Sequence, residues 1–397
     1  MKLTNLIEKK YLFYKGIAST SALLFAFIYS SSLGVVNRSI VTYIFVLSTL
    51  IWIVVTSGST LTLRKIQPNL DSPEMKSFIG LTSLQSFVAL VIFITGIEIY
   101  SRAIIKIPEN LYYLTIIYFL AAGLALLLIE YLISQLKYVL ASRMELVAVL
   151  LQFIVFELLK YSSLFSISVS LLLGFIISYL IISILIIQMS ELHKFGNLSV
   201  SSPSYFWNLS KGSHTLGVSI AVLDRLDKIF IAYFFPIGAL APYSILTSLI
   251  SVLRFIPEYL SRLLISYKKI YFLKFRFSKT IAIATTILIL TLISISSRGL
   301  IFALLGEDWV MPLAVCFAVS IQEAMRALFQ FQLNRLALLD KIHLKTFVPI
   351  FSLIVLIPFL YILSLNLGLV GVPVAYIFLY VIISYLIFKE GQKSLSL

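Results

Sequence analysis

Four charged residues lie inside one long apolar stretch, and they are the first place to look for chemistry. Asp224, Arg225, Asp227 and Lys228 are flanked by residues 216–223 and 229–235, which are apolar enough to be buried in a membrane. A charge at the bilayer centre costs about 2.5 to 3.5 kcal/mol, so these four are expected to be paired or to face a watery cavity. At about 1.5 Å per residue from Pro236, Asp224 lies about 18 Å along a helix, near the membrane midplane.

Other charged side chains recur three or four residues apart and therefore share a helix face. The pairs are Asp224 with Lys228, Arg254 with Glu258, Glu323 with Arg326, and Glu157 with Lys160. Two interpretations stay open: ion pairs that make burial tolerable, or groups that line a binding cavity. Arg and Lys are the natural partners of a diphosphate, and the candidates are Arg225, Lys228, Arg254, Arg326, Arg38 and Arg64.

A buried carboxylate such as Asp224 or Glu258 is also a candidate to bind the proton or cation that drives transport. A proton or cation gradient is therefore expected, with no other cofactor. Ordinary metal sites are not indicated, because the three histidines are scattered along the chain.

The composition shows which elements must position these groups. The chain is 60% hydrophobic and 12% charged, against about 25% charged in soluble proteins, which indicates an integral membrane protein. Its 397 residues have room for about twelve spans and no separate soluble domain. We place the spans near residues 16–33, 39–63, 78–99, 110–135, 144–163, 166–189, 213–235, 239–262, 280–297, 309–333, 346–364 and 368–388.

The basic residues predict the orientation of these spans. Most Lys and Arg fall in one set of alternate connections, and the opposite set holds only Arg38, Arg102, Lys106, Lys160 and Arg298. Cytoplasmic connections carry the excess of Lys and Arg, so both termini are predicted to be cytoplasmic. The net charge of +14 is thus a topology signal, and no nucleic-acid partner is expected.

The chain also shows signs of two lobes. Tyr43 and Ser48 recur at one constant offset as Tyr243 and Ser248. This pattern predicts a six-helix lobe over residues 1–189, a cytoplasmic connection over 190–212 and a second six-helix lobe over 213–397, enclosing a central cavity. Two lobes of this kind commonly expose a central site to one side and then to the other.

Several short motifs resemble those of one family. Asp224-Arg225 is followed by an apolar run, then Gly238 and Tyr243, and Gly306 precedes an acidic-aromatic turn at Trp309. Gly368 and Gly371 open the last span, and Gly34 with Tyr43 and Gly58 with Arg64 are similar features of the first two. In order and spacing these motifs resemble Wzx-type polysaccharide repeat-unit flippases of the multidrug/oligosaccharidyl-lipid/polysaccharide superfamily.

This resemblance implies a multi-pass protein of the bacterial inner membrane that moves undecaprenyl-diphosphate-linked repeat units, as in O-antigen and lipopolysaccharide synthesis. The implied partners are a lipid-linked oligosaccharide, membrane lipids, a polysaccharide polymerase and a chain-length regulator. The candidate cavity residues are Asp224, Arg225, Asp227, Lys228, Arg254, Glu258, Glu323, Arg326, Arg38 and Arg64.

Three alternatives stay open. A membrane polysaccharide polymerase is an enzyme of similar size, but it usually carries a large external loop. A multidrug or cation antiporter of the same superfamily would share the fold and differ in cargo. A lipid II flippase is expected to have two further helices. The sequence shows no P-loop, dinucleotide turn or nucleophile elbow, so the chain is not expected to be an enzyme.

Overall fold

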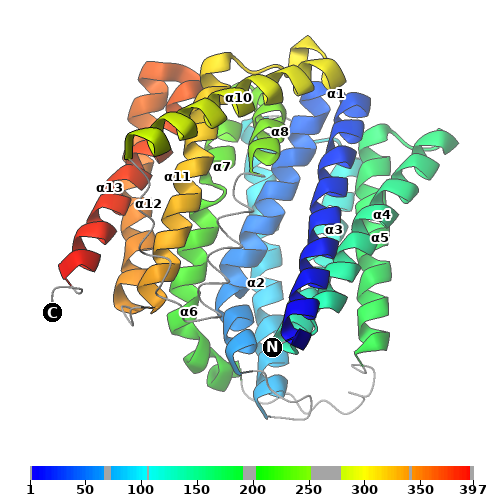
Figure 1. Cartoon of the computed structure of the whole chain (residues 1–397). Coiled ribbons are helices and arrows are strands. Elements are labelled where there is room, and N and C mark those ends of the chain that lie inside the picture. Colours follow the sequence, from blue (N-terminus) through cyan, green and yellow to red (C-terminus); the bar gives the residue numbers. More distant parts are fainter. Residues whose placement is uncertain are drawn as a thin grey trace. The chain divides into compact units, whose positions relative to one another are not determined.

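The computed structural model describes residues 2–66, 73–104, 107–190, 203–251, 279–338 and 342–393. Within these ranges the chain forms twelve α-helices and a few short 3-10 turns, and no strand (Figure 1). Six of the helical stretches described are long and apolar enough to cross a membrane. The prediction of an all-α integral membrane protein is confirmed.

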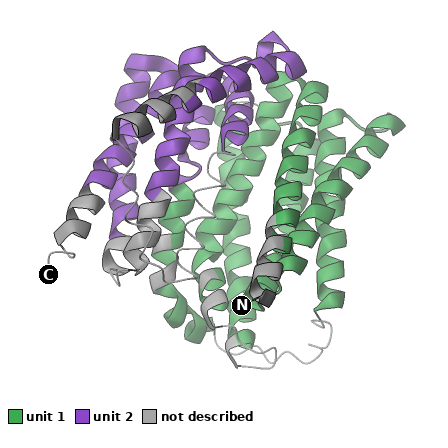
Figure 2. Cartoon of the chain, in the orientation of Figure 1, with its two compact units in different colours: residues 1–222 green, residues 223–397 purple. Residues whose placement is uncertain are grey.

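The chain divides into two compact units, residues 1–222 and 223–397 (Figure 2). We call them unit 1 and unit 2. The predicted lobe boundaries at 189 and 213 stay a prediction, since residues 191–202 lie outside the described part.

Unit 1 begins with a single long helical element that turns back on itself. The element α1, Lys2–Ile66, contains both of the first two predicted spans and is interrupted at Gly34, with φ 70° and ψ 166°. On a straight helix Tyr29 and Phe45 would lie about 24 Å apart. Both rings instead lie against Phe175, with centroids at 6.3 and 4.6 Å. Gly34 therefore reverses the chain, in a backbone region that is essentially restricted to glycine.

The remaining helices of unit 1 pack around the two arms of α1. They are α2 Pro73–Ala103, α3 Glu109–Ser134, α4 Tyr138–Ser162, α5 Ile167–Met189 and α6 Pro203–Leu223, whose last residue belongs to unit 2. The first arm of α1 runs parallel to α4. Its contacts keep a nearly constant separation in sequence, 130 residues from Lys15 to Glu145 and 128 from Ser32 to Lys160.

Aromatic packing fixes the second arm of α1 against α2 and α3. The Trp52 indole stacks on Phe119 and donates a hydrogen bond of 2.9 Å to its carbonyl oxygen, and Phe119 stacks in turn on Phe93. A Cβ atom at Gly123 would lie 1.8 Å from the indole, so only glycine fits there. This core holds the second arm of α1, which carries Arg38.

Unit 2 holds the rest of the helices. They are α7 Leu226–Phe234, α8 Leu240–Ile250, α10 Lys279–Leu305, α11 Leu313–Leu338, α12 Ile342–Leu367 and α13 Gly371–Lys393. Helix α13 packs against both α11 and α12. Residues 252–278 lie outside the described part, and with them Arg254 and Glu258.

One predicted span is not a continuous helix. We expected a single helix over residues 213–235, but α6 ends at Leu223 and α7 begins at Leu226. Asp224 and Arg225 lie in the break, and Arg225 has non-helical angles of φ −132° and ψ −7°. Apolar periodicity could not reveal the break, because the stretch contains neither proline nor glycine at this point.

Candidate functional site

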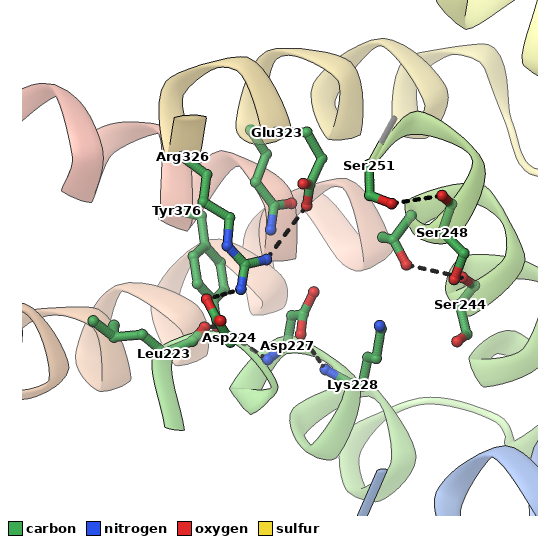
Figure 3. A network of polar contacts seen from close by, with 12 residues as sticks. Leu223, Asp224, Asp227, Lys228, Ser244, Ser248, Ser251, Glu323, Arg326 and Tyr376 are labelled. Carbon is green, nitrogen blue, oxygen red and sulfur yellow. Dashed lines mark hydrogen bonds and ion pairs between the residues drawn. The ribbon is translucent and has the colours of Figure 1, made fainter. Parts of the chain in front are cut away.

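The break between α6 and α7 places Asp224 beside α11 (Figure 3). Its carboxylate accepts a hydrogen bond from Arg326 Nη2, and the two groups form an ion pair. The spacing of Asp224 and Lys228 had predicted a shared helix face. That prediction is wrong, because the helical repeat is interrupted between them.

Arg326 joins two carboxylates that come from distant parts of the sequence. Its Nη1 lies 3.4 Å from Glu323 Oε1, one turn earlier on α11, while its Nη2 contacts Asp224. The Arg326 side chain is 9% exposed and that of Glu323 is 1% exposed. The guanidinium offsets part of the cost of burying Glu323, while Asp224 is 38% exposed. The sequence spacing indicated the pair on α11, and the structure adds Asp224.

Asp227, only 2% exposed, is held by neutral donors. The Tyr243 hydroxyl donates to Asp227 Oδ2 at 3.2 Å, and the backbone N–H of Lys228 donates to Oδ1 at 2.8 Å. Tyr243 also lies 3.4 Å from Gln322 Oε1 on α11. The hydroxyl therefore ties α7 and α8 to α11 around a buried carboxylate.

The charges of this network balance. Within the described residues it holds three acids, Asp224, Asp227 and Glu323, and three bases, Arg225, Lys228 and Arg326. The ammonium of Lys228 makes no ion pair with any residue that the structure describes, although the charge of Asp227 acts on it. The described charges of this network therefore compensate one another.

A second group of charges lies in unit 1, near the Gly34 turn. Lys160 Nζ, at the end of α4, donates to Ser32 Oγ at 3.1 Å and lies 3.7 Å from Glu157 Oε1. It also lies over the Phe156 ring, 5.6 Å from its centroid. Glu157 therefore compensates Lys160.

Arg38 belongs to the same group and lacks a protein partner for part of its guanidinium. Its Nε and Nη1 atoms are buried without a hydrogen bond to any residue described, and so is the hydroxyl of Tyr29. The Tyr29 ring lies 4.8 Å from that of Phe156, the residue before Glu157, and Arg38 and Glu157 both act electrostatically on its phenol. We call Tyr29, Ser32, Arg38, Glu157 and Lys160 the cationic cluster. It carries two positive charges and one negative.

The predicted site residues are thus separated into distinct groups. Unit 2 brings together Asp224, Arg225, Asp227, Lys228, Glu323 and Arg326, and Arg38 lies in unit 1. Arg64 lies in α1, with its side chain outside the described part. Among described residues, no group of His, Cys, Asp and Glu could hold a metal ion.

Tyrosines organise these groups, and the sequence motifs named only one of them, Tyr243, without its contacts. Tyr29, Tyr243 and Tyr376 lie in apolar stretches, where a tyrosine is as common in packing as in hydrogen bonding. Their partners are far away in the sequence, 149 residues for the contact between Tyr376 and Asp227. No local spacing in the sequence could identify these partners.

Comparisons with solved structures give the fold. The lipid II flippase MurJ, in an inward closed conformation, matches with a TM-score of 0.74 and 14% identity, over 98% of this chain and 87% of that one. An inward-facing multidrug resistance MATE transporter of the MOP superfamily matches with a TM-score of 0.60 and 12% identity, over 95% and 94%. A MOP-superfamily transporter from Pyrococcus furiosus matches with a TM-score of 0.58 and 13% identity, over 98% and 95%.

The fold is that of MOP-superfamily transporters. The Pyrococcus protein is described as having a binding pocket of reversed polarity that suggests a different function. No family model matches the sequence, and no curated protein matches it. At identities of 12 to 14% the likeness concerns the fold, so the cargo must be argued from the charged groups of this chain.

Proposed function

We propose that this chain flips a lipid-linked oligosaccharide, joined to undecaprenyl through a diphosphate, across the bacterial inner membrane by alternating access. The fold supports a transporter rather than an enzyme, and one protein with this fold is a lipid II flippase. The sequence motifs favour repeat units of the O-antigen or lipopolysaccharide type as cargo. A polysaccharide polymerase and a chain-length regulator are the partners we expect downstream, with both termini in the cytoplasm.

The observation that carries the proposal is the guanidinium of Arg38, whose Nε and Nη1 atoms are buried. Neither nitrogen has a partner among the described residues, and the Tyr29 hydroxyl has none either. A buried donor left without a partner costs about 1 to 3 kcal/mol, and more when it is charged. An anion with several oxygens, such as a diphosphate, would satisfy these donors. The single carboxylate of the cluster, Glu157, already pairs with Lys160.

The balanced network of unit 2 suits a different role. Asp224 and Asp227 are the acids we propose for the driving proton or cation, because both lie beside the helix break and belong to a network without net charge. Protonation of either would give the described network a net charge of about +1. A local change in charge can bias a two-state element, and here that element is the helix break.

The test is a deletion strain that is rescued by plasmid-borne variants. Lipid-linked single repeat units are expected to accumulate in the cytoplasmic leaflet, and the wild-type chain should clear them. Arg38→Ala should flip roughly tenfold to hundredfold more slowly, since a charge-assisted hydrogen bond contributes about 1.5 to 3 kcal/mol.

The matched control is Arg102→Ala, which removes an arginine of unit 1 that is 80% exposed and pairs with Glu98 on the helix surface. Full rescue by this variant would show that the loss at Arg38 is specific. Accumulation of single units already in the periplasm would mean that the chain is a polymerase. Normal flipping without the chain would favour the antiporter alternative.

A further inference from the structure

The helix break in unit 2 is closed by a side chain from another helix. Between Leu223 and Leu226 the regular helical hydrogen bonds are interrupted, which leaves backbone groups at the end of α6 and the start of α7 without helical partners. In the interior of a membrane protein such groups must be satisfied internally.

The hydroxyl of Tyr376, on α13, satisfies one group on each side of the break. It donates to the carbonyl oxygen of Leu223 at 3.0 Å and accepts from the backbone N–H of Asp227 at 3.0 Å. A phenol has one O–H donor and accepts through the same oxygen, so both functions are used. Tyr376 is fully buried, and its ring lies beside Asp224 and Arg326 (Figure 3).

This bridge fixes the backbone on either side of Asp224 and Arg225. The direction of the Asp224 side chain depends on the dihedral angles of the break, and in the observed conformation it meets Arg326. A continuous helix would direct Asp224 according to the helical repeat, without regard to Arg326. The position of Asp227 against Tyr243 depends on the start of α7 in the same way.

We propose that Tyr376 is a positioning residue: its hydroxyl holds the break between α6 and α7 so that Asp224 lies against Arg326. The proposal concerns the geometry of unit 2, and it rests on the proposed function only where the ion pair is given a role in transport. Tyr376 itself touches no cargo in this scheme.

Hydrogen exchange of the purified full chain tests the bridge without any cargo. Tyr376→Phe keeps the ring and removes the hydroxyl, so the amide of Asp227 should exchange about tenfold faster. The matched control is Tyr118→Phe in α3 of unit 1, where the buried ring packs on Phe45. It should leave that amide unchanged. Equal exchange in the wild type and Tyr376→Phe would overturn the proposal.

A double-mutant cycle on thermal unfolding tests positioning against simple packing. If Tyr376 acts through Asp224, Tyr376→Phe should lower the apparent Tm by about 3 °C in the wild type and by less than half of that beside Asp224→Asn. Tyr118→Phe, in unit 1, should change it equally in both backgrounds. Additive losses for Tyr376→Phe would mean that the tyrosine only packs.

Asp224→Asn alone covers the case in which Tyr376→Phe does not fold. In Asp224→Asn the amide of Asp227 should keep its protection from hydrogen exchange. A tenfold loss of that protection would mean that the ion pair, not Tyr376, holds the break. Export is measured separately. Tyr376→Phe and Asp224→Asn could be coupled in the thermal cycle while Tyr376→Phe exports normally. Tyr376 would then still be a positioning residue, but the ion pair of Asp224 and Arg326 would have no role in transport.

Discussion

At the scale of single residues, we expect the loss of Arg326 to destabilise the protein most. It pairs with Glu323, which is 1% exposed, and with Asp224 at the helix break. Removing one partner of a buried ion pair leaves an uncompensated charge, which typically costs 3 to 5 kcal/mol. We expect Arg326→Met to lower the free energy of unfolding by about this amount in detergent, as followed by denaturant titration.

A second substitution distinguishes the contribution of the Arg326 charge from that of its packing. Adding Glu323→Gln to Arg326→Met should restore part of the loss, because the buried carboxylate is then neutral. Arg102→Met is the surface control, since its exposed pair with Glu98 is expected to contribute little. Equal losses in the single and double variants would show that Arg326 stabilises by volume alone.

The site was predictable from the sequence only where both partners lie on one helix. Glu323 with Arg326 and Glu157 with Lys160 follow from spacings of three residues, and both pairs are observed. The contact between Asp224 and Arg326 spans 102 residues and depends on how α7 and α11 pack. The role of Tyr376 depends on a helix break that hydropathy does not record. Such contacts are properties of the packed unit.

At the scale of elements, the predicted spans fall on helices of the described part, but the eighth, 239–262, extends past residue 251 and is not tested there. Their errors came from local backbone geometry. The first two spans are joined through the single non-helical residue Gly34, and the seventh is broken at Asp224 and Arg225. Composition alone shows only that these segments are apolar enough to be buried.

The reversal in α1 yields a prediction about Gly34. No neighbouring atom would contact a Cβ there, so the restriction comes from the backbone angle of φ 70°. Gly34→Ala should lower the free energy of unfolding by about 1 to 3 kcal/mol. Gly16→Ala, in the first arm of α1 and also without a neighbour, should be neutral or slightly stabilising, because alanine favours helix. Equal behaviour of the two variants in thermal unfolding would show that the turn tolerates a side chain.

At the scale of the whole molecule, the all-α membrane architecture followed from composition and the spacing of apolar runs, and the MOP-superfamily fold agrees with it. The direction of the chain through the membrane is a separate matter, because it rests on the distribution of basic residues. That distribution predicts that Arg102 faces the periplasm and Lys137 the cytoplasm. Helix α3 lies between them and has 26 residues, about 39 Å, enough to cross the hydrocarbon core.

Cysteine labelling checks this orientation. Cys316 is buried in α11 and is first replaced by alanine, which leaves a background without thiols. Arg102 and Lys137 are both exposed, so a cysteine at either position is accessible to a reagent on its own side. A membrane-impermeant maleimide should label Arg102→Cys in intact cells and Lys137→Cys only after the membrane is opened. The reverse pattern would show that the chain has the opposite orientation. Labelling of both positions in intact cells would show that α3 does not span the membrane, because an intact bilayer shields one end of any spanning helix.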